Sequence, residues 1–422
     1  MRIGIIGAGR VGTTLGKGLE AAGHEVVYGV RELAKEPPYP GAATKVVREA
    51  VADSEVVILA TPWNGAEEAI ESAGDFGGKP LIDVTNPIGP GFTLTLGHTT
   101  SGGELLAALA KNAHVVKAFN TTGLENMASP SYGARRVVMP LASDDKNALA
   151  IAAQLATDLG FEAVPLSPLS RARLLEPFGL LWIKLALQLG HGRSIAFGIS
   201  RRTPDDKPSE TKRSGAPKTI TIVGTGNIGG ALARGWLRAG HAVRLATRDP
   251  NAKEVAALVA LGGKAVPITS AAKGADVVVL AVPAGAVSEI VAVVGPLEGV
   301  IVVDCTNAIG KGFSLQFGHT SSSSEEIAKT LPGAKLVRAF NQQGAETLQN
   351  AVFGGVAATT FVAADDAEAR ATVAALARDL GLDAVEAGAL SSSRELEPVT
   401  LLWIAIAQAI GTREFGLSLL RR

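Results

Sequence analysis

Three glycines near the amino terminus, Gly7, Gly9 and Gly12, have a spacing that suggests a binding chemistry. They follow the short apolar run 3–6, which predicts a strand, and precede a segment with helical periodicity. The first glycine permits a tight turn, the second lets the backbone approach a bound group, and the third lets the helix pack close to the strand. Free N–H groups at the start of a helix also attract phosphate. The spacing therefore predicts a site for the pyrophosphate of a dinucleotide.

The same glycine spacing occurs again at Gly224–Gly229, and other short sequences recur after it in the same order. Gly-His-Thr and Ala-Phe-Asn, for example, each occur twice at a nearly constant separation. Such self-similarity predicts a duplicated domain. We expect copy 1 at residues 1–200 and copy 2 at residues 218–422. The segment 201–217 is rich in Pro, Lys, Asp and Ser, which predicts a flexible linker.

Short apolar runs alternate with helical patterns along each copy, which is typical of an α/β fold. We expect two Rossmann-type domains in tandem, each with a doubly wound parallel sheet and a small C-terminal helical cap. Trp182 and Trp403 mark the cap helices, which Pro177 and Pro398 should kink or restart. The strands of copy 1 are predicted near residues 2–6, 25–29, 55–60, 80–84, 114–118, 136–140 and 161–164. Its helices are predicted near residues 10–22, 42–51, 64–73, 102–111, 144–158 and 168–190.

An arginine follows the second predicted strand of each copy, Arg31 in copy 1 and Arg248 in copy 2. An NAD site would have an Asp or Glu at this place for the ribose hydroxyls. A guanidinium suits the 2′-phosphate of NADP(H) instead. Thr247 adds a hydroxyl, which makes the signature stronger in copy 2. Alternatively, Glu32 and Asp249 could simply pair with the arginines on the surface.

Two further loops of each copy are predicted to lie at the same edge of the sheet. The first is Thr61–Trp63 in copy 1 and Val282–Ala284 in copy 2, where a rigid proline turn would line the cofactor. The exchange of a tryptophan for an alanine indicates that the two pockets differ. The second loop follows the inner strand and contains Ala-Phe-Asn. The predicted cofactor-binding residues are Gly7, Ala8, Gly9, Arg10, Val11, Gly12, Arg31, Thr61, Pro62, Trp63, Ala118 and Asn120 in copy 1, and Gly224, Thr225, Gly226, Asn227, Ile228, Gly229, Thr247, Arg248, Val282, Pro283, Ala339 and Asn341 in copy 2.

The sequence contains no nucleophile elbow and no P-loop lysine. Hydride transfer needs alignment and the exclusion of water rather than such groups, because the cofactor carries the reaction. Asn120 and Asn341 are catalytic candidates because they end an inner strand at the predicted edge. His98 and His319 are the others, since a histidine there could assist a proton transfer, although loop packing is an alternative role. Asp83 and Asp304 also end strands, where Asp commonly caps a turn.

The composition narrows the class of protein. The 40 basic and 40 acidic side chains cancel, so the net charge favours neither nucleic acid nor an anionic membrane. The single cysteine, Cys305, suits a reducing compartment, and the dispersed histidines lack the spacing of metal ligands. The longest apolar helical run, 178–189, is too short to span a bilayer, and the early first strand leaves no room for a signal peptide. We therefore expect a soluble cytoplasmic protein without a metal site.

Both copies resemble the NADP-dependent oxidoreductases of the coenzyme F-420 (deazaflavin) type, and are similar to the cytosolic domain of the six-transmembrane metalloreductases. The resemblance rests on the glycine motif, the arginine after strand two, Thr61–Trp63, Val116–Thr121 and the Ser…Arg…Glu patterns in Pro168–Glu176 and Leu390–Glu397. It implies that the first three elements bind NADP(H) and that Ala-Phe-Asn lies by the nicotinamide. It also implies that the late helix helps to form a flavin or deazaflavin pocket.

We expect an oxidoreductase that transfers hydride between NADP(H) and coenzyme F-420, FMN or FAD. One alternative is a pyrroline-carboxylate-reductase-like or hydroxyacid dehydrogenase, with Lys184 as proton donor, although Ala405 lies at the nearby place in copy 2. Another is a module that binds NADP(H) without turnover. We also expect the copies to form an intramolecular pseudo-dimer, because the apolar helices around Trp182 and Trp403 would otherwise leave exposed patches.

Overall fold

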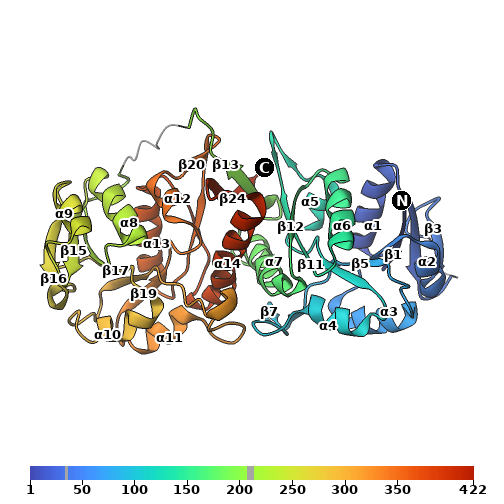
Figure 1. Cartoon of the computed structure of the whole chain (residues 1–422), viewed down its shortest axis with the longest axis horizontal. Coiled ribbons are helices and arrows are strands. Elements are labelled where there is room, and N and C mark those ends of the chain that lie inside the picture. Colours follow the sequence, from blue (N-terminus) through green and yellow to red (C-terminus); the bar gives the residue numbers. More distant parts are fainter. Residues whose placement is uncertain (34–36, 207–212) are drawn as a thin grey trace. The chain divides into compact units, whose positions relative to one another are not determined.

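The computed structural model describes residues 1–33, 37–206 and 213–422 (Figure 1). The chain forms two compact units, each described here by itself. Unit 1 comprises Met1–Gly198, Ile404–Gly411 and Leu420–Arg422, and unit 2 comprises Ile199–Trp403 and Thr412–Leu419. Residues 207–212 of the predicted linker lie outside the described residues, so the predicted domain boundaries stay predictions.

Unit 1 is built on a sheet with the strand order β12-β11-β8-β5-β4-β1-β2-β3. The strands from β8 to β3 are parallel and have the order of a Rossmann fold. The direction then changes, because β11 pairs antiparallel with β8 and parallel with β12. The strands are β1 (Arg2–Ile6), β2 (Glu25–Val30), β3 (Ala43–Val46), β4 (Val56–Leu59), β5 (Pro80–Asp83), β8 (His114–Lys117), β11 (Val138–Ser143) and β12 (Glu162–Leu166).

The central strands of this sheet are apolar because they are covered on both faces. All residues of β4 and β5 are buried, and Asp83 is the one charged residue among them. Helix α1 buries Leu15 and Leu19 on one face, with Gly12 and Gly16 allowing close packing. The helices are α1 (Arg10–Ala21), α2 (Val47–Asp53), α3 (Ala66–Ala73), α4 (Gly102–Leu109), α5 (Leu124–Ala128), α6 (Lys146–Asp158) and α7 (Ala172–Leu187), with the 3-10 helices η1 (Trp63–Gly65) and η2 (Leu169–Arg171).

Unit 2 repeats this plan with the parallel order β16-β15-β14-β17-β18-β19, and β22 pairs with β23 separately. Its strands are β14 (Thr219–Val223), β15 (Ala242–Thr247), β16 (Lys264–Pro267), β17 (Val277–Leu280), β18 (Ile301–Asp304), β19 (Lys335–Arg338), β22 (Thr359–Val362) and β23 (Asp383–Glu386). Its helices are α8 (Asn227–Arg238), α9 (Lys253–Val259), α10 (Val287–Val291), α11 (Ser323–Lys329), α12 (Ala345–Gln349) and α13 (Ala367–Arg378), with the 3-10 helices η3 (Ile268–Ser270), η4 (Ala284–Ala286), η5 (Lys311–Phe313) and η6 (Leu390–Ser392). Helix α14 (Ser393–Ile410) belongs to unit 2 as far as Trp403.

The predicted α/β class, with two doubly wound domains and a cap helix in each, is confirmed. Two local predictions are wrong. The helix predicted at 42–51 begins only at Val47, because residues 43–46 form β3, in which Thr44 pairs with Tyr28 of β2. The prediction that α7 and α14 restart at Pro177 and Pro398 is also wrong, because each helix continues through its proline; a kink at these positions stays a prediction. Each proline lies early in its helix and removes a single backbone donor.

Short strands also occur where the sequence predicted loops. Some form hairpins, and others lie next to the cap helices. They are β6 (Ile88–Gly89), β7 (Thr93–Leu94), β9 (Ser131–Tyr132), β10 (Arg135–Arg136), β13 (Ile195–Arg201), β20 (Val352–Phe353), β21 (Val356–Ala357) and β24 (Phe415–Arg421). Within the described ranges, no helix combines the length and the apolar character that crossing a membrane requires.

Candidate functional site

The glycine turn of copy 1 has the geometry of a phosphate cradle. Gly7 has a φ of +108°, and a Cβ atom there would lie 2.7 Å from the carbonyl oxygen of Ala60. A Cβ atom on Gly12 would lie 2.0 Å from the Gly7 carbonyl oxygen, so the helix and the turn are in contact. Around the Cβ position of Gly9, by contrast, the described residues place nothing within 4 Å. The space beside Gly9 is therefore open for a ligand to approach the backbone.

Copy 2 repeats this geometry. Gly224 has a φ of +98°, a Cβ atom on Gly229 would lie 1.9 Å from the Gly224 carbonyl oxygen, and the Cβ position of Gly226 is open on its described surroundings. Neither α1 nor α8 has an acidic residue in its first turn, so nothing there opposes an anion. Of the predicted cradle residues, Arg10 and Asn227 are exposed like Gly9 and Gly226, whereas Ala8, Val11, Thr225 and Ile228 are half-buried.

The two predicted phosphate-binding arginines differ in their surroundings. Arg31 is exposed, and its Nη2 atom lies 3.0 Å from Oε2 of Glu68 at the start of α3. It therefore pairs with Glu68 and not with Glu32. Arg248 is also exposed, and its side chain makes no hydrogen bond or ion pair with any described residue. The hydroxyl of Thr247 takes part in a local turn, donating to the Asp249 carbonyl oxygen at 3.0 Å. Arg248 is the cation that is free to meet a phosphate.

The loop after β4 lies against the cradle of copy 1, because the Gly7 turn approaches Ala60 and Thr61. Oγ1 of Thr61 is buried and has no hydrogen-bond partner in the part of the chain described. Trp63 is half-buried, and its ring would lie 3.0 Å from a Cβ atom on Gly102, the first residue of α4. In copy 2 the cradle contacts Val282 instead. Pro62 and Pro283 are exposed and precede the 3-10 turns η1 and η4.

Asn120 fixes the loop after β8 to the cap helix. Its Nδ2 atom donates to Oδ1 of Asn86 and to the carbonyl oxygen of Leu175 in α7, both at 3.0 Å. Nδ2 of Asn86 donates back to the Asn120 carbonyl oxygen at 2.8 Å. The Asn120 side chain is 3% exposed, and no described residue donates to its Oδ1 atom. Ala118 and its counterpart Ala339 are fully buried.

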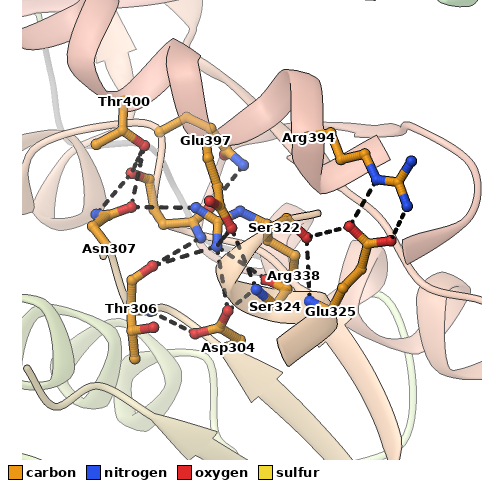
Figure 2. Close-up of polar contacts among 12 residues, drawn as sticks. Asp304, Thr306, Asn307, Ser322, Ser324, Glu325, Arg338, Arg394, Glu397 and Thr400 are labelled. Carbon is orange, nitrogen blue, oxygen red and sulfur yellow. Dashed lines mark hydrogen bonds and ion pairs between the residues drawn. The ribbon is translucent and has the colours of Figure 1, made fainter. Parts of the chain in front are cut away.

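Asn341 has more partners in copy 2. With its amide oxygen facing the guanidinium of Arg338, that oxygen accepts hydrogen bonds at 2.7 to 2.9 Å. Thr400 of α14 donates to the Asn341 carbonyl oxygen at 2.8 Å, and its Oγ1 atom lies 3.2 Å from Oδ1 of Asn307. Figure 2 shows Asn307, Arg338 and Thr400 converging at this end of the sheet.

His98 and His319 each lie at the centre of a tight turn. The N–H of Thr99 donates to the Gly97 carbonyl oxygen at 2.8 Å, and Thr320 makes the same bond to Gly318 in copy 2. The histidines have φ values of +61° and +60°, which bulky residues rarely adopt. Such strain is typical of functional sites, and it occurs in both copies. The proton-transfer role of these half-buried histidines stays a prediction.

Sequence reasoning missed a buried cluster of charges at the carboxyl end of the sheet. In copy 1, Lys117 donates to Oδ2 of Asp83 at 2.8 Å and to the Thr85 carbonyl oxygen at 2.7 Å. Its Nζ atom lies 2.9 Å from Oε1 of Glu176, and the three charged side chains are at most 1% exposed. The first two N–H groups of α4 donate to the Glu176 carboxylate at 2.9 and 3.0 Å. The cluster thus connects two strands of the sheet with α4 and α7.

Copy 2 has the same cluster with an arginine in place of the lysine (Figure 2). Nη1 of Arg338 lies 3.2 Å from Oδ2 of Asp304 and 3.3 Å from Oε1 of Glu397. Ser324 donates its hydroxyl to Asp304 at 2.6 Å and its N–H to Glu397 at 3.3 Å. A charged residue at the end of an otherwise apolar strand is the sequence signal for such a cluster, because a buried charge requires partners.

Each cluster has two carboxyl groups for one cation, and the pKa of its glutamate is raised. Burial raises the pKa of Glu397 to about 7. Burial also raises the pKa of Glu176, by more than Lys117 and the N–H of Gly102 lower it. Burial acts to lower the pKa of Lys117, but the carboxylates of Asp83 and Glu176 outweigh it, so the pKa is raised.

The late Ser…Arg…Glu pattern is divided between this cluster and the surface. Glu176 belongs to the cluster, whereas Arg173 pairs in two places with Glu104 of α4, at 2.8 and 2.6 Å. Ser101 caps the same helix by accepting from the Glu104 N–H at 3.1 Å. Arg394, Glu325 and Ser322 repeat this arrangement in copy 2. The predicted role of the late helix in an acceptor pocket stays a prediction.

Other candidate groups lie apart from these loops. Lys184 is half-buried in the last turn of α7, where a cation suits the helix dipole. Among the residues that the structure describes, no three His, Cys, Asp or Glu side chains are grouped so that they could hold a metal ion.

Comparison with known proteins identifies relatives of each copy. The family model described as NADP oxidoreductase coenzyme F420-dependent matches residues 2–87 and 219–308. The metalloreductase STEAP3 of Rattus norvegicus is 29% identical over 203 residues, which are 48% of this chain and 40% of that protein. The chain thus matches about two fifths of the length of this curated relative.

Two solved structures are also similar. A candidate F420-dependent NADP reductase from Arthrobacter sp. FB24 is 29% identical, with a TM-score of 0.43, over 46% of this chain and 96% of that chain. A hypothetical protein from Sinorhizobium meliloti, SMa0349, is 33% identical, with a TM-score of 0.37, over 42% of this chain and 88% of that chain. Each family match covers the cradle and the strands up to β5 or β18. The family model described as NADP oxidoreductase coenzyme F420-dependent thus matches two segments of the chain, one in each copy, so the similarity is repeated in tandem.

Proposed function

We propose that this protein is an NADP(H)-dependent oxidoreductase that transfers hydride between NADP(H) and a deazaflavin or a flavin. The observation that carries the proposal is the open cradle. Beside Gly9 and Gly226 the described residues leave the Cβ position free, directly in front of helices whose first turns lack acidic residues. An arginine follows the second strand in each copy, as a 2′-phosphate requires.

In this proposal the cofactor is held by the backbone of the glycine turn and by the arginine. The N–H groups at the start of α1 or α8 donate hydrogen bonds to the pyrophosphate, and Arg31 or Arg248 binds the 2′-phosphate. Arg31 must share its charge with Glu68, 3.0 Å away, whereas Arg248 has no such competitor among the described residues. When bound, NADPH supplies the hydride from its nicotinamide ring.

The protein contributes position and a dry environment rather than acid–base chemistry. Trp63 covers the start of α4, and Asn120 holds the loop after β8 against α7. The buried cluster around Lys117 fixes the same helices to the sheet. Rigid surroundings of this kind keep a donor and an acceptor aligned and exclude water. The acceptor itself remains part of the proposal, and the loops after β5 and β18 are where we expect it to bind.

Anaerobic assays with NADPH and each of three acceptors, F-420, FMN and FAD, test the proposal. We expect oxidation of NADPH with at least one acceptor, at a kcat/KM about 10-fold or more above that with NADH. Gly215→Val is a matched control for cradle variants, because Gly215 is exposed, lies outside the cradle and has an open Cβ position. If wild-type protein oxidises NADPH with none of the three acceptors, the proposal fails.

A further inference from the structure

We propose that the two copies have different tasks: copy 1 performs the hydride transfer, and copy 2 holds NADP(H) without turning it over. This inference rests on the proposed function. It comes from comparing the copies residue by residue, because the two cradles are alike whereas the surroundings of the reacting ring are not.

The phosphate-binding half of the site is preserved in copy 2. Both central glycines, Gly9 and Gly226, have open Cβ positions on their described surroundings and ordinary φ values of −77° and −66°. Both third glycines contact the first glycine of their own turn. Arg248 is less engaged than Arg31, which pairs with Glu68. Copy 2 therefore keeps every feature that binding of the nucleotide needs.

The aromatic wall of copy 1 has been replaced in copy 2. Trp63 begins η1 and packs against Gly102 at the start of α4, where an added Cβ atom would lie only 3.0 Å from its ring. Ala284 begins η4, and Ser323 begins α11. The large side chain and the glycine of copy 1 thus correspond to a small side chain and a serine. At the position of Trp63, copy 2 therefore has no ring that could stack beside the nicotinamide.

Copy 1 also carries two polar atoms that are still without partners. Oγ1 of Thr61 and Oδ1 of Asn120 are buried, and neither forms a hydrogen bond within the described residues. Buried polar groups are nearly always paired, so two such atoms, one in the loop after β4 and one in the loop after β8, point to a ligand or an ordered water that completes them. Val282 replaces Thr61 in copy 2 and has no hydroxyl that could form a hydrogen bond with a ligand.

In copy 2 the equivalent asparagine is already satisfied. The amide oxygen of Asn341 accepts from Arg338 at 2.7 to 2.9 Å when it faces that cation. Lys117 cannot do the same for Asn120, because its single ammonium group is used by Asp83, Glu176 and Thr85. An arginine has five donors and reaches further than a lysine, which is why this exchange changes the loop.

The loop after β19 is also filled from the cap helix and from its own residues. A Cβ atom on Gly179 of α7 would lie 2.5 Å from the Asn120 carbonyl oxygen, so this place stays empty in copy 1. Thr400 fills it in copy 2 and donates to the Asn341 carbonyl oxygen at 2.8 Å. Gln342 replaces a threonine, and its Nε2 atom donates to the Phe361 carbonyl oxygen at 3.4 Å. The amide oxygen of Asn341 is thus bonded internally, whereas that of Asn120 is left for a ligand; the buried atoms without a described partner in these loops of copy 2 are Oγ1 of Thr306 and Oε1 of Gln343.

A single-turnover experiment on the wild-type protein tests the division. The protein is loaded with NADPH to saturation, freed of excess nucleotide, and mixed anaerobically with F-420, FMN or FAD. We expect two bound equivalents, of which one is oxidised in a fast phase and the other about 100-fold more slowly. Oxidation of both equivalents at one rate overturns the inference and leaves the proposed function standing. Oxidation of neither, with all three acceptors, means that the proposed function itself has failed.

Two matched variants assign the phases. Gly9→Val and Gly226→Val each place a side chain where the pyrophosphate would lie, without a clash in the described structure. We expect each to bind one equivalent of NADPH by calorimetry, which also shows that the other copy is folded. Gly9→Val should lower kcat about 100-fold. If Gly9→Val keeps about half of the wild-type kcat, or if Gly226→Val still binds as many equivalents as wild type, the division is wrong.

Discussion

Glu397 allows a quantitative test of the buried cluster in copy 2. Its side chain is 3% exposed, lies 3.3 Å from Arg338, and shares that cation with Asp304. Burial raises its pKa from the ordinary 4.5 to about 7. In the folded state Glu397 thus keeps a proton that the unfolded chain has already released between these pH values. Folded stability from this group is therefore greatest at low pH and falls as the pH rises to about 7.

The size of the effect follows from linkage. A shift of one pKa unit corresponds to about 1.4 kcal/mol. A folded-state pKa of about 7 then removes about 2–3 kcal/mol of the free energy of unfolding between pH 5 and pH 8. Glu397→Gln cannot titrate but can still accept a hydrogen bond from Arg338. The difference in stability between this variant and wild type should move by that amount, in favour of the variant as the pH rises.

Urea unfolding, read by pulsed hydrogen exchange and mass spectrometry, measures this difference for peptides of β19 and α14. The comparison uses pH 5, 6, 7 and 8, and Glu176→Gln serves as the control whose effect should appear in peptides of β8 and α7. A difference between variant and wild type that stays the same from pH 5 to pH 8 would refute the argument. That outcome would mean that Arg338 holds Glu397 ionised in the folded protein at all four pH values.

Three further predictions concern single side chains. Arg248→Ala should weaken binding of NADPH about 10-fold or more with little effect on NADH, since it removes a charge-assisted pair with the 2′-phosphate, and calorimetry on the Gly9→Val background isolates this effect. Lys117→Met should lower the free energy of unfolding by about 3–5 kcal/mol, because it leaves Asp83 and Glu176 buried without their cation, as urea titration would show. Gly12→Ala should destabilise copy 1 by about 1–3 kcal/mol and abolish NADPH binding there, because its Cβ atom would lie 2.0 Å from the Gly7 carbonyl oxygen. Thermal melts measure the loss of stability, and binding titrations measure the loss of NADPH binding.

Each of these predictions has a contradicting outcome. Equal loss of NADH and NADPH affinity in Arg248→Ala would remove Arg248 from the 2′-phosphate. A Lys117→Met protein as stable as wild type would mean that the carboxyl groups are protonated or hydrated. Gly12→Ala with normal binding would mean that the turn moves aside at little cost.

The fold was predictable where the local sequence pattern of a segment favours the same structure as its packing in the folded protein. The glycine turn, the first strand and α1 lie where the sequence predicts them, because each glycine there has a backbone reason. Residues 43–46 were not predictable as a strand, because their short run becomes β3 only by pairing with β2. The proline effect was overestimated for α7, since early in a helix the packing of Phe178 and its neighbours outweighs one lost bond.

The site was predictable in outline and not in detail. The sequence places the cradle, the arginine and the Ala-Phe-Asn loop at one edge, because these follow from strand order. It does not show that Lys117 meets Glu176, which lies far along the chain, or that Arg31 meets Glu68. Such pairs depend on how helices lie across the sheet ends, and no local periodicity reports that. Whether the predicted ligand contacts form stays a prediction.

The neighbours Trp63 and Gly102 have a consequence for the history of the duplication. Serine in place of Gly102 alone would place its Cβ atom 3.0 Å from the tryptophan ring, so the serine of copy 2 is accommodated more easily beside the smaller residue Ala284. Because two packed residues such as these must change together, exchanging only one of them between the copies should lower stability. Gene conversion that restores one member of a pair would then be selected against. The sequences of the two copies should therefore diverge by paired substitutions. Chimeras of the two copies should fold and function only when all residues that pack against one another are exchanged together.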